Sequence, residues 1–337
     1  MGVIIMDFFI QSRQRRLRRN EAIRALVQES FIREADLILP LFIIEGDSIR
    51  QEIPSMPGVF RLSINEALSV VNEAMLLGIR SFALFPCIDS SLKDADGSEA
   101  MNSNNLICRA VREIKRRYSD AFIICDVALD PYTTHGHDGV LGVDGDVDND
   151  ATIEILANQA LILANSGCDA VAPSDMMDGR IGYIRTVLDS SGFENTIIIA
   201  YAAKYASSFY GAFRDAVGSK SLLGIADKKT YQMNPANSIE ALREVASDVA
   251  EGADIVLIKP GLHYLDIILQ TKLEFDVPVF AYHVSGEYSM LKFAEEKGVL
   301  DYNKAIMETM LCFKRAGASG IFTYAAIDVA RIIRGLV

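Results

Sequence analysis

In the stretches Ile199-Ala-Tyr-Ala-Ala-Lys-Tyr205 and Ile255-Val-Leu-Ile-Lys-Pro-Gly261, a short apolar run ends in a lysine. Short, nearly continuous apolar runs are typical of strands that are buried on both faces of a parallel sheet. A lysine at the end of such a strand lies close to the core. The two stretches therefore predict two buried strands, each with an amine at or just past its carboxyl end.

Six further runs complete a regular series. The eight predicted strands cover residues 37–43, 81–85, 121–127, 169–173, 196–202, 254–259, 277–284 and 320–324. Amphipathic segments alternate with them, most clearly at 63–77, 150–166, 238–251 and 302–316, and a glycine that can end a helix follows each of these. This alternation predicts an α/β fold, a closed parallel (β/α)8 TIM barrel, with a doubly wound open sheet as the alternative.

Two segments lie outside the simple barrel pattern. Residues 1–35 contain the basic cluster Arg13-Gln-Arg-Arg-Leu-Arg-Arg19 and predict an extended N-terminal arm for subunit contacts, or a solvated arm. Residues 36–337 are then a single catalytic barrel. Within the barrel, the long connection at about 205–235 predicts an active-site lid, because long loops in compact domains are commonly lids.

Composition excludes several classes of partner. The chain has 337 residues and a net charge of −12, which would repel a nucleic-acid backbone. No apolar stretch reaches the roughly 18 residues of a membrane span, and no basic region precedes the first apolar residues. The five cysteines form no CxxC pair and predict reduced thiols. We expect a cytoplasmic protein without nucleic-acid or membrane partners.

The two strand-end lysines point to imine chemistry. Burial disfavours the ammonium form, so it lowers a lysine pKa from its usual value of about 10.4, and a second lysine nearby lowers it further. A neutral amine can attack a carbonyl substrate. The alternative for either lysine alone is a side chain that merely extends to solvent.

Other polar residues follow the same pattern. Asp126, Ser174, Asp175, Ser285 and Tyr324 also close or follow predicted strands. In a barrel these strand ends meet at one mouth, where catalytic groups gather. Polar groups near a core cost free energy unless they have partners. We therefore expect these side chains to form one site with the lysines.

The densest polar cluster is Asp126-Val-Ala-Leu-Asp-Pro-Tyr-Thr-Thr-His-Gly-His-Asp-Gly139. Its carboxylates and imidazoles offer an oxygen-rich site that favours Mg²⁺ over Zn²⁺. The bare pair His135 and His137 is a weak metal signal. A turn-rich loop satisfied by its own side chains is an equal alternative.

Seven stretches reproduce, in order, the motifs of one known family. They are Asp126 to Gly139, Ala172-Pro-Ser-Asp-Met-Met-Asp-Gly-Arg180, Tyr201 to Gly211, Phe213-Arg-Asp-Ala216, Lys229-Thr-Tyr-Gln-Met-Asn-Pro235, Ile258-Lys-Pro-Gly261 and Val284-Ser-Gly-Glu-Tyr288. With them the chain resembles the porphobilinogen synthase (5-aminolevulinic acid dehydratase) family, from the basic arm to the last strand. The substrate follows only from this resemblance.

The resemblance implies a hydro-lyase that condenses two 5-aminolevulinate molecules into porphobilinogen with loss of two waters, an early step of tetrapyrrole synthesis. It assigns the imine of the first substrate to Lys259 and that of the second to Lys204. By the same resemblance, Ser285 and Tyr324 bind the carboxylate of the first substrate, and Arg214, Lys228 and Gln232 bind that of the second. Asp126 and Ser174 orient an amino group and assist proton transfer. Phe213 and Tyr201 make further substrate contacts.

One departure bears on the metal. Where the zinc-dependent branch has three cysteines, this chain has Ala128, Asp130 and Asp138. The resemblance thus implies no zinc-thiolate site, and Mg²⁺ or a monovalent cation at Asp130 and Asp138. It further implies an allosteric Mg²⁺ held through waters by Glu244, with Asp175 in the outer sphere, that favours a homo-octamer. An exposed helical carboxylate is the alternative for Glu244.

Three other functions stay open at this point. One is a barrel aldolase that uses a single imine lysine. Another is a catalytically silent barrel that acts by assembly or sequestration through the basic arm. The third is a Mg²⁺-dependent hydrolase centred on His135 and His137.

Removal of the arm through Arg19 is expected to reduce the size of the assembly, because the polar arm adds nothing to the barrel core and is placed to reach another subunit. Sedimentation velocity of the truncated and full-length proteins checks this. An unchanged sedimentation profile would contradict a role for the arm in assembly.

Overall fold

The computed structural model of the chain describes residues 12–217 and 227–337. The chain divides into two compact units, Met1–Phe31 and Ile32–Val337. The described part of the first unit holds a 3-10 helix, η1 (Gln14–Arg18), and a short helix, α1 (Glu21–Leu26). The Asn20 side chain accepts a hydrogen bond from the Ile23 amide and so caps α1. The division falls a few residues before the arm boundary predicted at residue 35.

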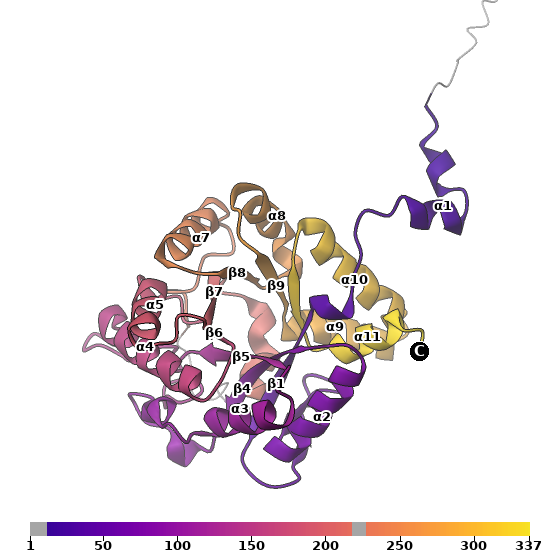
Figure 1. Cartoon of the computed structure of the whole chain (residues 1–337). Coiled ribbons are helices and arrows are strands. Elements are labelled where there is room, and N and C mark those ends of the chain that lie inside the picture. Colours follow the sequence, from indigo (N-terminus) through magenta and orange to yellow (C-terminus); the bar gives the residue numbers. More distant parts are fainter. Residues whose placement is uncertain (1–11, 218–226) are drawn as a thin grey trace, which may run out of the picture. The chain divides into compact units, whose positions relative to one another are not determined.

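The second unit contains the predicted closed barrel (Figure 1). Its parallel strands are β1 (Leu37–Ile44), β4 (Ser81–Cys87), β5 (Phe122–Val127), β6 (Ala170–Pro173), β7 (Ile197–Lys204), β8 (Ile255–Lys259), β9 (Val279–His283) and β10 (Gly320–Thr323). Each pairs with the next, and β10 returns to β1 through the register Leu37↔Ile321. The ring of pairing is complete, which excludes the open sheet.

Helices surround the barrel (Figure 1). They are α2 (Ile64–Leu76), α3 (Leu106–Arg117), α4 (Asn149–Asn165), α5 (Arg180–Ser190), α7 (Ile239–Glu251), α8 (Leu265–Glu274), α10 (Tyr302–Ala316) and α11 (Ala326–Ile333). Of these, α2, α4, α7 and α10 match the individually predicted segments. Gly252 and Gly317 end α7 and α10 with φ of 107° and 105°, the left-handed conformation that glycine adopts without strain.

The strands have few polar residues because both of their faces are covered. In β7, for example, every residue after Ile197 is buried, including Lys204 at its end. Aromatic rings fill part of the barrel interior: Tyr282 lies 5.1 Å from Phe322 and 6.5 Å from Tyr201, measured between ring centroids. This packing leaves the strand-end amine of Lys259 beside rings rather than water.

Several elements are added to the eight strand–helix units. A hairpin of β2 (Arg50–Glu52) and β3 (Phe60–Leu62) pairs with the carboxyl-terminal half of β1. Two helices, α6 (Gly211–Ala216) and α9 (Ser285–Glu296), follow β7 and β9. The remaining short helices are η2 (Glu34–Asp36), η3 (Ser90–Leu92), η4 (Ser98–Met101), η5 (Ser208–Tyr210) and η6 (Leu262–Tyr264).

The predicted lid, 205–235, begins with η5 and α6, and its middle part, 218–226, lies outside the described residues. Among the residues that the structure describes, no helix combines the length and apolar character needed to cross a bilayer.

Candidate active site

The two strand-end lysines lie side by side. Lys204 and Lys259 are the last residues of the neighbouring strands β7 and β8, and they are partners in the strand register. Adjacent strands are about 4.8 Å apart. Both residues are buried, with 6% and 5% of their surface exposed. The structure thus places the two predicted lysines together, both buried, at one end of the barrel.

Lys259 lies in an aromatic enclosure. Its Nζ is 4.6 Å from the ring centroid of Tyr282, 4.9 Å from that of Phe213 and 5.1 Å from that of Tyr201. Burial, aided by the charge of Lys204 and opposed by nearby carboxylates, lowers the pKa of Lys259 to about 7. A large fraction of this amine is therefore neutral, and nucleophilic, at neutral pH.

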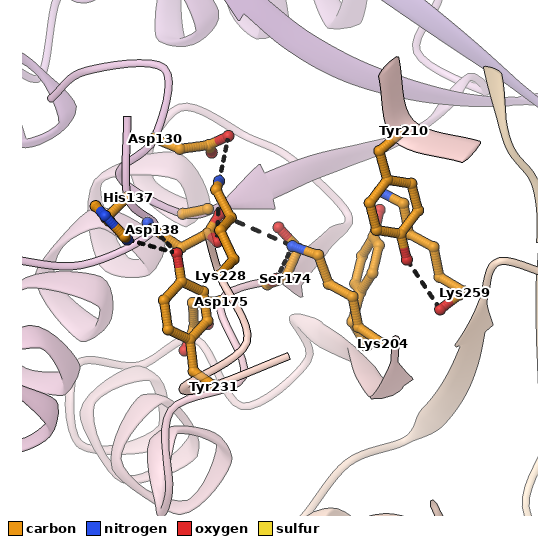
Figure 2. A network of polar contacts seen from close by, with 12 residues as sticks. Asp130, His137, Asp138, Ser174, Asp175, Lys204, Tyr210, Lys228, Tyr231 and Lys259 are labelled. Carbon is orange, nitrogen blue, oxygen red and sulfur yellow. Dashed lines mark hydrogen bonds and ion pairs between the residues drawn. The ribbon is translucent and has the colours of Figure 1, made fainter. Parts of the chain in front are cut away.

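Lys204 has polar neighbours instead. Its Nζ donates a hydrogen bond to the Ser174 carbonyl oxygen and lies 3.8 Å from Asp138 Oδ1. Figure 2 shows this amine between Ser174 and the carboxylates. The two lysines thus share one site but differ in environment, with rings around one and oxygen atoms around the other.

Asp126, at the end of β5, is suited to proton transfer. Burial, together with the charge of Asp130, raises its pKa to about 7, although both strand-end lysines oppose the shift. Its Oδ1 is buried and has no hydrogen-bond partner among the described residues. A carboxyl group with a pKa near the working pH can both donate and accept a proton.

Lys228 lies between Asp130 and Asp138, which together form an acidic cluster (Figure 2). Its Nζ is 3.3 Å from Asp130 Oδ2 and 3.1 Å from Asp138 Oδ2. Burial alone would raise the pKa of Asp138, but the ammonium groups of Lys204 and Lys228 lower it to about 2. The two aspartates predicted to hold a cation therefore already share an ammonium group, and a metal ion there remains a prediction.

The residues expected around the first substrate converge on Lys259. The Tyr324 hydroxyl is 3.1 Å from that of Tyr282, whose ring adjoins Lys259. Ser285 Oγ accepts a hydrogen bond from the Phe213 amide at 3.0 Å. Ser285 therefore contacts the same segment, α6, that carries Phe213 to the lysine.

The residues expected around the second carboxylate come from both described parts of the predicted lid segment, 205–235. Arg214 lies on α6 and is half-buried. Lys228 and Gln232 follow the undescribed segment, and both are buried. The Gln232 amide donates to the Lys228 carbonyl at 2.8 Å, which fixes the two residues relative to each other. Their contacts with substrate remain predictions.

Glu244 lines a cavity of about 380 Å³ to which Tyr231 and Gln232 also contribute. This cavity is lined by oxygen-bearing side chains that include Asp146, Asp178, Glu240 and Glu244. Glu244 is half-buried, and burial raises its pKa. Nearby, Asp175 is fully buried, with its Oδ2 3.7 Å from Arg180 Nε and neither atom hydrogen-bonded within the described residues.

The two histidines of the polar cluster do not face a common ligand position. His135 Nε2 lies 3.0 Å from the Ala95 carbonyl, whereas His137 Nδ1 lies 3.1 Å from the Tyr231 hydroxyl. Within residues 12–217 and 227–337, no group of three or more His, Cys, Asp or Glu side chains is arranged to hold a metal ion. Both histidines thus contact residues outside the 126–139 segment, and a metal ion there stays a prediction.

Tyr210, Tyr231 and Tyr282 are part of the site but carried no separate assignment in the sequence. Tyr282 and Tyr231 adjoin Lys259 and His137, and Tyr210 donates to the Lys259 carbonyl at 3.1 Å. Tyr282 lies inside the predicted strand 277–284 rather than at its end, so the strand-end pattern did not single it out. It is the residue before the last one of β9, and the strand period that turns it toward the barrel interior was the available signal.

Comparison with known proteins identifies the family. The delta-aminolevulinic acid dehydratase family profile matches residues 11–332. The chain belongs to the delta-aminolevulinic acid dehydratase family. A delta-aminolevulinic acid dehydratase from Bradyrhizobium diazoefficiens is 53% identical over 96% of this chain and 91% of its own length. The enzyme from Halalkalibacterium halodurans is 48% identical over 95% and 96% of the two chains.

A solved structure agrees with this membership. The delta-aminolevulinic acid dehydratase (porphobilinogen synthase) of Toxoplasma gondii, in complex with the reaction product porphobilinogen, superposes with a TM-score of 0.94 at 48% identity, over 96% of this chain and 92% of the other. At this identity and coverage the likeness extends beyond the fold. The chain is an enzyme, a lyase of the dehydratase family.

The pKa of Lys259 can be measured without substrate. Because its pKa is about 7, raising the pH from 6 to 8 converts most of the ammonium to free amine, and acetic anhydride labelling of Lys259 should rise about tenfold. Lys304, exposed and with its pKa raised by Asp301, is the internal control and should keep gaining reactivity beyond pH 9. Quantitative peptide mapping reads both. Parallel profiles for the two lysines would contradict the depressed pKa.

Proposed function

We propose that the chain condenses two molecules of 5-aminolevulinate into porphobilinogen, through imines at both Lys259 and Lys204. One observation carries this proposal: the two buried amines are register partners at adjacent strand ends. Two keto acids bound to them would be held within reach of each other. Such tethering turns a reaction between two molecules into an effectively intramolecular one.

Lys259 is the better first nucleophile. Its neutral amine attacks the ketone carbon, and the resulting carbinolamine loses water as the C=N bond forms. Asp126 supplies the proton that the leaving hydroxyl needs, since its pKa of about 7 keeps part of the carboxyl group protonated. The aromatic rings exclude competing water from this amine.

Lys204 takes the second substrate in the same way, with loss of the second water. Its Nζ already contacts Ser174, the residue expected to orient the amino group of a substrate. Formation of the C–C and C–N bonds of the product releases both lysines, so the net reaction loses two waters. Porphobilinogen bound in the Toxoplasma gondii relative supports the same product here.

Charge explains how an acidic chain accepts an acidic substrate. Arg214 and Lys228 supply local positive charge, and a guanidinium can bind a carboxylate through two hydrogen bonds. Lys228 is paired with Asp130 and Asp138 in this structure. We infer that the substrate carboxylate joins or replaces this pairing, so that Lys228 links the acidic cluster to the second substrate.

Borohydride trapping tests the proposal. With 5-aminolevulinate and borohydride, peptide mapping should find reduced adducts on Lys259 and Lys204. Lys259→Ala should lower porphobilinogen formation by a factor of about 10³ or more, because the covalent path is lost. Lys304→Ala, at an exposed lysine on α10, is the control and should retain activity.

A single-lysine aldolase predicts a different result. In that case Lys204→Ala would keep substantial turnover. Wild-type protein that yields neither an adduct nor porphobilinogen would refute the proposal as a whole.

We also infer a hydrated Mg²⁺ at the Glu244 cavity and a homo-octamer in the cytoplasm. The cavity fits such an ion, because its lining offers carboxylate oxygens and Mg²⁺ keeps several of its waters. When bound, the ion would supply positive charge to Glu244 and its neighbours. The arm supports assembly: Leu26 and Phe31 are 80% and 56% exposed, and α1 buries none of its residues.

Substitution of Glu244 tests the magnesium site. Glu244→Ala should abolish stimulation by Mg²⁺ and shift the sedimentation profile toward smaller species at the same Mg²⁺ concentration. The exposed Glu308 on α10 provides the control, and Glu308→Ala should behave as the wild type. A Mg²⁺ response that survives in Glu244→Ala, with an unchanged assembly, would count against the site.

A further inference from the structure

The hairpin of β2 and β3 is not part of the eight strand–helix units, yet it lies at the catalytic end of the barrel. β3 pairs with β1 through Phe42↔Arg61 and Ile43↔Leu62, near the carboxyl end of β1. The hairpin is therefore fixed to the same rim that carries the lysines. Its position suggests a task at the mouth rather than in the core.

Arg61 connects this hairpin to the lid helix α6. Its Nε donates to the Ala216 carbonyl at 2.7 Å, and its Nη2 donates to the Asp215 carbonyl at 2.6 Å. These carbonyls belong to the last two residues of α6. The guanidinium donates to both acceptors and complements the negative end of the helix.

A second contact reinforces the first. Ser55, in the turn of the same hairpin, donates from Oγ to Asp215 Oδ2 at 2.7 Å. The turn is held in its own place by α9, because the Ser289 hydroxyl donates to the Ser55 carbonyl at 2.7 Å and the Tyr288 hydroxyl to the Pro57 carbonyl at 2.6 Å.

The other end of α6 is fixed as well. The Phe213 amide donates to Ser285 Oγ, which donates in turn to the Phe209 carbonyl at 3.3 Å. Gly286 permits this approach, because a Cβ atom there would lie 2.7 Å from the Phe209 carbonyl oxygen. The helix is thus held between the start of α9 and the hairpin.

These contacts at the two ends of α6 fix the position of Phe213. Its ring lies 4.9 Å from Lys259 Nζ, 5.4 Å from the Phe85 ring and 5.7 Å from the Phe42 ring. It therefore forms part of the enclosure that keeps water from the amine. A shift of α6 would move Phe213 away from Lys259 and displace Arg214, the next residue along the helix.

We propose that Arg61 is a positioning residue, which caps the carboxyl end of α6 and thereby holds Phe213 over Lys259 and Arg214 at the second-substrate position. Arg61 touches neither lysine and acts only through the helix. The inference about Arg214 rests on the proposed function, whereas the inference about Phe213 and Lys259 does not, since it concerns the free enzyme.

Two readouts on Arg61→Ala test this role. In the free enzyme, the pH midpoint for acetic anhydride labelling of Lys259 should move upward, because water replaces part of the aromatic enclosure. In turnover, kcat/KM for 5-aminolevulinate should fall about tenfold or more, with a clear rise in KM. Arg61→Lys keeps the charge but cannot donate through two guanidinium N–H groups at once, so it should show smaller changes than Arg61→Ala in both readouts.

Arg50→Ala is the matched control. Arg50 lies on the same hairpin, over the Phe60 ring at 4.4 Å, and among the described residues it donates no hydrogen bond to α6. It should leave the labelling midpoint and kcat/KM unchanged. Ser55→Ala should give a smaller change in the same direction as Arg61→Ala, and it supplies a test even if Arg61→Ala fails to fold.

The outcomes separate the two proposals. A folded Arg61→Ala with wild-type labelling and kinetics overturns the positioning role, as do equal losses in Arg50→Ala and Arg61→Ala. Wild-type protein that makes no porphobilinogen refutes the proposed function, yet the labelling midpoint of Lys259 in the free enzyme still tests whether Arg61 holds Phe213 in place.

Discussion

Register pairing between β7 and β8 is the constraint on which this site depends. It sets Lys204 beside Lys259 at the ends of two strands whose spacing the backbone hydrogen bonds fix. No loop conformation enters that geometry. The closed ring of strands then makes the spacing rigid, because each strand is held on both sides. Rigid strand spacing suits a site that joins two small molecules, since the reacting atoms must be placed within a fraction of an ångström.

The same scaffold gives the two amines unlike surroundings. Residues that alternate inward along β7 and β9, Tyr201 and Tyr282, place rings beside Lys259, and burial lowers its pKa. Lys204 faces the acidic segment that follows β5, and Asp138 lies 3.8 Å away. Carboxylates further away partly offset the effect of burial on Lys259, whereas among the described residues only Lys204 of the two has a carboxylate oxygen within 4 Å. The order that we propose, with Lys259 reacting first, rests on this difference in surroundings.

Elements added at the carboxyl ends of the strands complete the site. Lys228 brings an ammonium group to Asp130 and Asp138, which would otherwise be two carboxylates in a buried position. On the opposite side, α6 carries Phe213 to Lys259 and is held by the hairpin and by α9. The barrel fixes the positions of the two amines, whereas these short segments supply the charges and rings that surround them. Division of labour between a rigid scaffold and its loops is general in barrels.

Local patterns in the sequence determined the eight strands, four of the helices and the strand-end placement of Lys204 and Lys259, because apolar runs and their periods depend on neighbours in the chain. Family motifs added the substrate and the acidic segment. Only the tertiary structure placed Arg61 at the end of α6, 155 residues away, and Lys228 between Asp130 and Asp138. The hairpin strands span three residues each, too short to show a period. Contacts between such distant residues depend on how the barrel closes, which no local pattern records.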